Sequence, residues 1–272
     1  MSISTEPLPG TTRDPLYPDT DGLPMAESEL HFLAIKYLYG ALSYWFRSRE
    51  DVHVAANMLL YYEQGSPAKN RGPDVMVSKG VRGKHRRRSF RTWEEGVVPA
   101  VIIEIASIGT QREDEIVKPH VYAGIGVKEY FMFDPAGEYL QPRLRGFRLE
   151  NEEYELMPAD EAGGIFSAEL GLRLVVDDEL LRLVDPATGA AIPTEEESAE
   201  QLDEALRRAE EAQREAEQAK SEAEQAKSEV EQAKSEVEQA QRKAEAERKR
   251  AAMLEAEVTR LRASLPSDST RE

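Results

Sequence analysis

A repeat of seven residues dominates the last third of the chain. The segments KSEAEQA, KSEVEQA and KSEVEQA follow one another from Lys220, and the stretch from Ala191 onward has no aromatic residue and mostly alanine as its apolar complement. Such a stretch cannot bury a globular core, whereas a strict period of seven predicts a left-handed supercoil of helices. The last third of the chain is therefore predicted to be a coiled-coil helix.

The heptad register places small or branched side chains along one seam. With Val230 and Val237 at position a, the seam extends in both directions and only Glu247 interrupts it. Its members are Leu202, Ala205, Ala209, Ala212, Ala216, Ala219, Ala223, Ala226, Val230, Ala233, Val237, Ala240, Ala244, Ala251, Leu254, Val258 and Leu261. Glu222 at g can then meet Lys227 at e of a parallel partner.

Two interpretations of the seam stay open. The favoured one is a homodimer through a parallel coiled coil over residues 202–261. The alternative is a single solvated helix held by Glu–Lys pairs four residues apart, because alanine in the seam buries little apolar surface. In either case the helix is expected to project from the rest of the chain, since no wide apolar face would hold it against a domain.

The composition changes near Pro193. The first part of the chain holds both tryptophans and all the other aromatic residues, so only this part can bury a core. Thr194 followed by three glutamates predicts a helix start, and Pro266 predicts its end. The predicted divisions are an extended arm (1–24), a globular domain (25–190), a linker (191–198), the coiled-coil helix (199–265) and a disordered tail (266–272).

Several classes of protein are excluded. The chain has no cysteine and only four histidines, which rules out a disulfide framework, a thiolate metal site and an ordinary zinc site of mixed ligands. The longest apolar runs fall far short of the ~20 residues that a membrane span needs, and residues 1–13 lack the pattern of a signal peptide. A cytoplasmic protein is expected.

The globular part reads as an α/β domain. Apolar residues at spacings of three and four predict an amphipathic helix from Ala26 to Arg47. The predicted strands are Val52–Tyr62, Asp74–Ser78, Ala100–Ala106 and Lys128–Asp134, with a helix at Gln111–Ala123 closed by Gly124 and Gly126, and a hairpin of Leu144–Leu149 and Tyr154–Leu156 turning at Asn151. This order predicts a mixed sheet flanked by helices.

Two carboxylates stand on predicted neighbouring strands. Asp74 opens one apolar strand, and Glu104 lies inside the apolar run of the next. A carboxylate inside a buried strand is costly unless a cation satisfies it. Together with the carbonyl of Ile105, these two acids offer the hard oxygen ligands that Mg²⁺ prefers. The alternative is that Glu104 lies at a sheet edge and pairs with a basic residue such as Lys118.

Lys118 is the candidate for direct assistance to chemistry. It lies on the following helix with Asp114 four residues before it and Tyr122 four residues after it, so the three side chains share one face. A lysine beside the acids could hold or deprotonate an attacking water, or stabilise the negative charge that develops in phosphodiester cleavage. The alternative is an ordinary surface pair of Asp114 and Lys118.

Several segments together resemble a known family. They are YPDTDGLPMAESELH, GPDVMVS at 72–78, VIIEIAS at 101–107, and the spaced Asp114, Lys118 and Tyr122 that lead to GVKEYFMFDP ending at Pro135. Their order and spacing resemble the Uma two family of restriction endonucleases, in the PD-(D/E)xK nuclease superfamily, over roughly residues 15–185 of this chain.

This resemblance implies a restriction-endonuclease-like fold for residues 25–190 and a metal-dependent DNA endonuclease activity, with Mg²⁺ as the cofactor and Mn²⁺ as its alternative. It implies Asp74 and Glu104 as metal ligands and catalytic residues, and an accessory acid on the first helix, Glu27 or Glu29. One departure from the superfamily pattern stands out. Ala106 occupies the position of the expected lysine two residues after the second acid, and the resemblance implies Lys118 as its replacement, with Tyr122 as an accessory residue.

DNA binding needs a local basic patch, because a chain with a net charge of −17 repels DNA on average. Arginines and lysines crowd one segment between Ser78 and Trp93, and Arg86, Arg87 and Arg88 are its centre. These three are the predicted nucleic-acid contacts. The alternative is a solvated charged loop whose positive charge balances acidic surface elsewhere on the protein.

Two classes of function follow from the sequence. One is a Mg²⁺-dependent endonuclease in which Asp74 and Glu104 hold the metal and Lys118 assists. The other is a non-catalytic protein that keeps the nuclease fold as a DNA-binding or scaffolding module and is dimerised by its coiled coil.

Overall fold

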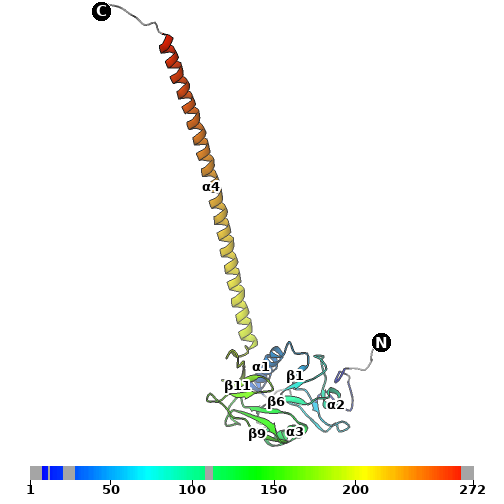
Figure 1. Cartoon of the computed structure of the whole chain (residues 1–272). Helices are drawn as coiled ribbons and strands as arrows, with labels where there is room; N and C mark the ends of the chain where they lie inside the picture. Colours follow the sequence, from blue (N-terminus) through cyan, green and yellow to red (C-terminus); the bar gives the residue numbers. More distant parts are fainter. Residues whose placement is uncertain (1–7, 12, 21–27, 108–112, 265–272) are drawn as a thin grey trace, which may run out of the picture. The chain divides into compact units, whose positions relative to one another are not determined.

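The computed structural model describes residues 8–11, 13–20, 28–107 and 113–264. The chain divides into two compact units, Met1–Ala199 and Glu200–Glu272. The first unit contains all the strands of the described residues, and the second is occupied by the long helix α4 (Figure 1). Glu27 and residues 265–272 lie outside the described ranges.

A six-stranded mixed sheet forms the centre of the first unit. Its strands, in spatial order, are β1 (Val52–Ala56), β4 (Val75–Lys79), β6 (Pro99–Ile105), β7 (Glu129–Phe133), β8 (Leu144–Glu150) and β9 (Glu153–Leu156). Strands β6 and β7 run parallel, and the other neighbours run antiparallel. The mixed α/β fold predicted from the sequence is confirmed.

Two smaller sheets complete the unit. One is formed by β10 (Ile165–Ser167), β11 (Leu172–Asp177) and β12 (Leu180–Val184), and the other by β3 (Asn70–Arg71), β2 (Leu60–Tyr61) and β5 (Phe90–Arg91). The first of these packs its apolar residues into the same core as α1 (Glu29–Trp45).

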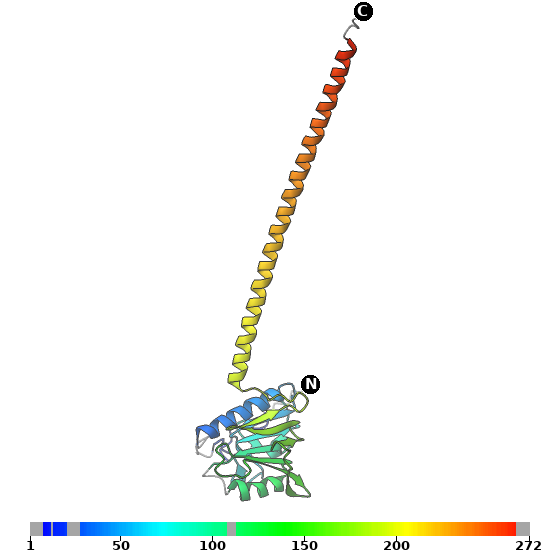
Figure 2. The same ribbon diagram turned by 90° about the vertical axis from the view of Figure 1, so that its left-hand side faces the viewer.

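The central sheet has a core on each face because successive side chains of a strand point to opposite faces. Along β6, Val101, Ile103 and Ile105 face the core under α1, whereas Ile102 faces the core that contains Tyr122 of α3 (Lys118–Ile125). Figure 2 shows α1 in blue and α3 in green on opposite sides of the sheets. Glu104 belongs, by this alternation, to the α3 face.

The helices begin and end where their capping residues dictate. Ser28 accepts from the N–H of His31 and caps α1, so the helix begins at Glu29 rather than at Ala26 as predicted. The second predicted helix is π-helical at Glu113–Val117 before it continues as α3, and Gly126 in the left-handed region (φ 90°) ends it.

One predicted strand is split. Residues 52–62 form β1 and β2 with a break at Asn57, whose φ of 48° is incompatible with an extended strand. The N–H of Asn57 donates to the carbonyl of Asp74 (3.0 Å), so the break helps to hold the residue that precedes β4. The hairpin of β8 and β9 forms as predicted, with Asn151 and Glu152 at positive φ in its turn.

The described part of the predicted N-terminal arm is packed on the unit. Tyr17 is buried against Tyr61 and Trp93, and the hydroxyl of Tyr61 donates to the carbonyl of Pro18 (2.7 Å). At Tyr17 and Pro18 the segment is therefore packed against the first unit and is not a free extended arm.

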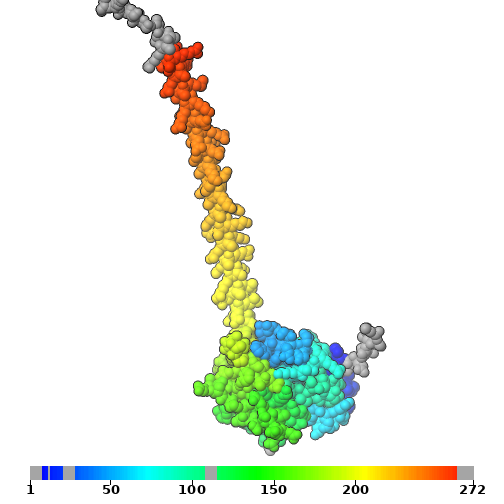
Figure 3. Space-filling model, viewed as in Figure 1, coloured from blue at the N-terminus to red at the C-terminus, as the bar shows by residue number. Residues whose placement is uncertain are grey.

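The helix α4 (Glu195–Ser264) begins with a reciprocal cap. The N–H of Glu197 donates to Thr194 Oγ1 (3.1 Å), and the N–H of Thr194 donates to Glu197 Oε2 (2.8 Å). The helix start predicted at Thr194 is confirmed, although it falls within the stretch predicted as a linker. From Glu200 to Leu261 every described side chain is exposed, as the space-filling view illustrates (Figure 3). Among the described residues no helix has the length and apolarity to cross a membrane.

Candidate active site

Strand geometry brings the two predicted acids together. Asp74 immediately precedes β4, Glu104 is the penultimate residue of β6, and the antiparallel register sets Val75 opposite Ile103. The N–H of Asp74 donates to Glu104 Oε2 (3.3 Å), and the N–H of Ile105 donates to Asp74 Oδ2 (2.7 Å). Both carboxylates therefore lie at the same end of the central sheet.

Glu104 is satisfied by one turn of α3. The hydroxyl of Tyr122 donates to Oε1 (2.8 Å), and Lys118 Nζ lies 3.1 Å from Oε2. Glu104 is 1% exposed, and β6 lies between β4 and β7, so this carboxylate is not at a sheet edge. The contact with Lys118 that the alternative interpretation expected is present, but in the interior of the fold.

Asp74 has a partner that the sequence interpretation missed. His31 Nε2, on the first turn of α1, lies 3.2 Å from Asp74 Oδ1, and both side chains are largely buried. A signal existed in the sequence, because His31 stands three, four and seven residues before the buried Ala34, Ile35 and Leu38. That spacing predicts a buried histidine, although it does not identify the partner.

The other predicted residues of this region take different positions. Glu29 is exposed at the first position of α1, and Glu27 lies outside the described residues. The side chain of Asp114 is also not among those that the structure describes. Of the three side chains predicted to share one face of this helix, the structure therefore shows only Lys118 and Tyr122.

A third carboxylate at this end of the sheet serves the backbone. Asp134 follows β7 and is fully buried. Its two oxygens accept from the N–H groups of Ala136, Gly137, Tyr139 and Leu140. These bonds fix the loop after β7, and Asp134 is therefore a structural residue.

The donor chemistry of the acid pair suits Mg²⁺ or Mn²⁺. Within the described ranges no group of three or more His, Cys, Asp or Glu side chains is assembled for a metal. Mg²⁺, however, is usually held by only one or two carboxylates and keeps several waters. Asp74 and Glu104 supply two carboxylates. The third predicted oxygen ligand is the carbonyl of Ile105, a residue whose N–H donates to Asp74. The residues present fit such an ion.

The three predicted DNA contacts lie in three different environments. The Arg87 side chain is completely buried with Glu95, with Nε–Oε1 2.5 Å and Nη2–Oε2 3.0 Å. This burial argues against its predicted contact with phosphate, because reaching a phosphate would break this pair. Arg88 is half exposed and lies 2.7 Å from Asp19 Oδ2, whereas Arg86 is exposed.

Much of the basic segment stabilises the fold. Lys84 Nζ donates to the carbonyls of Phe46 and Arg47, both at 2.7 Å, at the end of α1. A cation there complements the negative end of the helix dipole. Arg91 is 3% exposed and lies 2.9 Å from Glu94. The freely exposed cationic surface is therefore smaller than the sequence indicated.

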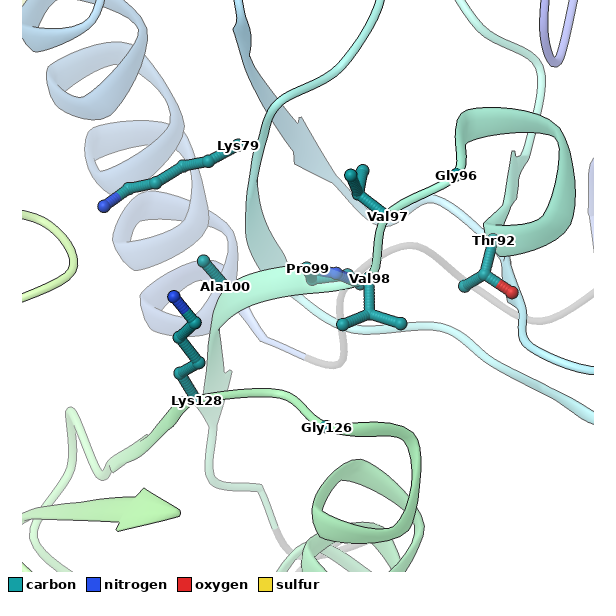
Figure 4. A pocket seen from close by; sticks show the side chains of 9 residues that line it. All are labelled: Lys79, Thr92, Gly96, Val97, Val98, Pro99, Ala100, Gly126 and Lys128. Atoms are coloured by element: carbon teal, nitrogen blue, oxygen red, sulfur yellow. The ribbon is translucent and has the colours of Figure 1, made fainter. Parts of the chain in front are cut away.

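A pocket of about 530 Å³ lies at the opposite end of the central sheet, where β4 ends and β6 begins (Figure 4). It is lined by Lys79, Thr92, Gly96, Val97, Val98, Pro99, Ala100, Gly126 and Lys128. Lys79 and Lys128 both contact Glu169, at 2.8 and 3.1 Å, which offsets their charge. This pocket contains neither acid of the pair.

The sequence and structure were compared with known proteins. Among curated proteins, none matches the sequence. A solved structure from Anabaena variabilis ATCC 29413, described as "a putative nuclease belonging to DUF820", is similar with 11% identity and a TM-score of 0.40. That similarity covers 53% of this chain and 74% of the other. Residues 17–180 match the Uma2 family, described as "Putative restriction endonuclease". This match spans more than half of the sequence, and the chain therefore belongs to the Uma2 (Uma two) family of nucleases.

Proposed function

We propose that the protein is a Mg²⁺-dependent DNA endonuclease that hydrolyses phosphodiester bonds. The observation that carries this proposal is the pairing of β4 with β6, which brings Asp74 and Glu104 so close that the N–H of Asp74 donates to Glu104 and the N–H of Ile105 donates to Asp74. Membership of a nuclease family supports the same reaction class. Mn²⁺ is expected to replace Mg²⁺, because both ions accept hard oxygen ligands.

Asp74 and Glu104 would hold the metal. When bound, the ion lowers the pKa of a coordinated water and offsets charge on the scissile phosphate. The protein's own residues supply position and charge around it. The hydroxyl of Tyr122 orients Glu104 (2.8 Å), and Lys118 contributes a buried positive charge 3.1 Å from the same carboxylate.

Lys118 is the residue proposed to assist the chemistry directly. Its ammonium is largely buried, so its charge is weakly screened by solvent. A lysine in this position stabilises negative charge on the phosphate oxygens as the bond breaks, or holds the attacking water.

The nucleic-acid surface is proposed to include Arg86 and Arg88. Arg86 is exposed, and Arg88 needs only to exchange the carboxylate of Asp19 for a phosphate oxygen. These contacts would position DNA without reading its sequence.

A plasmid-nicking assay tests the activity. The full-length protein is incubated with supercoiled DNA and Mg²⁺ or Mn²⁺, and the Glu104→Ala variant is the matched control. Conversion to nicked or linear DNA by the unaltered protein alone supports the proposal. Equal conversion by both proteins indicates a contaminating nuclease, and no conversion by either argues against the activity.

A second function is favoured by one specific feature. Each acid of the pair already has a basic side chain as a partner, His31 for Asp74 and Lys118 for Glu104, and the charge of Glu104 is compensated by the ammonium of Lys118. A non-catalytic DNA-binding or scaffolding module would have such a compensated site. Calorimetric titration with Mn²⁺ separates the two functions, because only the nuclease requires binding that is lost in Asp74→Ala.

We propose further that two copies associate through a parallel coiled coil over residues 202–261. The apolar seam residues Leu202, Val230, Val237, Leu254, Val258 and Leu261 are 48–60% exposed in the single chain. A partner helix would cover them, and Glu222 and Lys227 would meet across the pair. Two nuclease domains held this way suit cleavage of both strands of a duplex.

A further inference from the structure

The first turn of α1 fixes His31 in place. Ser28 caps the helix by accepting from the backbone N–H of His31 at 3.2 Å, and the residue is 6% exposed. A capped backbone and a buried ring leave the imidazole little freedom to move away from its contacts.

The imidazole meets Asp74 on one side of the carboxylate. Nε2 lies 3.2 Å from Oδ1, while the backbone N–H of Ile105 donates to Oδ2 at 2.7 Å. The two oxygens are therefore approached from different elements, α1 and β6, and rotation of the carboxylate would break at least one contact.

Glu104 is held in a matching way. One of its oxygens accepts from the hydroxyl of Tyr122, and the other lies beside Lys118. Each acid thus has at least one neutral donor and one basic side chain, and each basic side chain comes from a helix on a different face of the sheet. Residues that hold a metal ligand in place change metal affinity about 10–100-fold when they are removed.

We propose that His31 is a positioning residue for the metal site, which holds Asp74 in the orientation required to bind the ion. The inference rests on the proposed function, since it assigns His31 a role in metal binding. The role depends on the polar contact between Nε2 and Oδ1 and does not require a charge. A neutral donor of similar reach should therefore replace the histidine.

The test measures Mn²⁺ affinity by calorimetric titration of the full-length, metal-free protein. His31→Leu removes the donor and should weaken binding about 10–100-fold. His31→Gln keeps an amide donor and should retain most of the affinity. His53→Leu is the matched control, because His53 is a second largely buried histidine, on β1, that stacks on Phe90, and it contacts neither acid in the part of the chain that the structure describes. It should leave the affinity unchanged.

A metal-free measurement tests the contact itself. Midpoints of chemical unfolding are compared for His31→Leu, Asp74→Asn and the double variant. The two substitutions should be less destabilising together than their separate effects predict, because either one already removes the contact.

The outcomes are distinguishable. If the unaltered protein binds Mn²⁺ and His31→Leu binds it equally well, the role of His31 is overturned and the proposed function stands. Strictly additive unfolding midpoints also overturn it, since they show that the contact does not exist in solution. If the unaltered protein binds no Mn²⁺, the proposed function fails, and the role of His31 in metal binding fails with it.

Discussion

Lys118 Nζ lies 3.1 Å from Glu104 Oε2, although the lysine begins α3 and the glutamate lies in β6. The PD-(D/E)xK pattern that the sequence resembles has a lysine on the strand, two residues after the second acid, but this chain has the buried Ala106 there. The contact shows that a helix can bring an ammonium group to the same acid from outside the strand.

Replacing Lys118 by Met should lower the nicking rate by roughly 10²–10³-fold, because a buried charge near the reacting phosphate is lost. Lys118→Arg keeps the charge and should lose less. The measurement is the single-turnover rate with Mg²⁺. A Lys118→Met variant that nicks at the rate of the unaltered protein would remove the lysine from the proposed chemistry.

Glu104→Gln should abolish cleavage and Mn²⁺ binding while the protein stays folded. The amide preserves the shape and still accepts from Tyr122, but it leaves Lys118 without a counter-charge, at a cost of about 1–3 kcal/mol in unfolding free energy. Calorimetry and thermal melts with and without Mn²⁺ check both parts. Retained Mn²⁺ binding together with lowered stability would make Glu104 a purely structural partner of Lys118.

Arg86 and Arg87 are neighbours with opposite expected roles. Arg87→Ala should lower the unfolding free energy by about 3–5 kcal/mol, because it leaves Glu95 as an uncompensated buried charge. Arg86→Ala should change stability by less than about 0.5 kcal/mol. It should also reduce the salt dependence of DNA binding by about one unit of slope. Urea unfolding and fluorescence anisotropy at several salt concentrations measure these effects, and an unchanged slope in Arg86→Ala excludes that contact.

His53 should make the protein less stable in mild acid. Burial, with smaller contributions from the charges of Arg87 and His85, lowers the pKa of His53 to about 4 from its ordinary 6.5. The unfolded chain takes up a proton near pH 6.5 and the folded chain only near pH 4. Stability is therefore fully present above pH 6.5 and falls as the pH drops toward 4, by up to about 2–3 kcal/mol.

The variant His53→Gln isolates this contribution, because glutamine does not titrate. Between pH 7 and pH 4 the unaltered protein should lose more stability than the variant. Parallel curves for the two proteins would mean that His53 is protonated equally in the folded and unfolded states.

The coiled coil is tested by changing only its charges. Replacing Lys220, Lys227 and Lys234 by glutamate puts like charges at the g and e positions of a parallel pair. The dimer should therefore be weaker and should dissociate at a higher protein concentration than the unaltered dimer. Light scattering on the full chain and on residues 1–199 provides the comparison. The shorter chain should be a monomer, and a dimer of residues 1–199 would place the interface in the first unit.

The sequence predicts the central strands and the acid pair well, because both leave local patterns. Apolar runs mark β4 and β6, and a carboxylate inside such a run is conspicuous. The small sheet of β10 to β12 was not predicted, since its short strands pair with each other and derive their burial from α1, which is distant in sequence. His31 was missed as a site residue for the same reason, because its partner Asp74 belongs to another element.

In the basic segment, composition alone does not predict which side chains are buried. Composition marks Arg86, Arg87 and Arg88 as equivalent, but only the fold decides that Arg87 is enclosed with Glu95 while its neighbours reach the surface. A run of like charges therefore predicts a location for cations without predicting which of them solvent can reach.

Because β4 and β6 run antiparallel, the two acids lie at one end of these strands and the connection between the strands starts and ends at the other. β4 runs away from Asp74 for five residues, roughly 15 Å, before the chain turns through residues 80–98 and β6 returns to Glu104. Apart from β5 and the buried Arg87–Glu95 pair, changes at exposed positions where β4 ends and β6 begins would be built at the far end of the strands. Relatives with different connections here can thus keep an identical pair of acids, and a designer can alter this loop's surface without re-aligning the carboxylates.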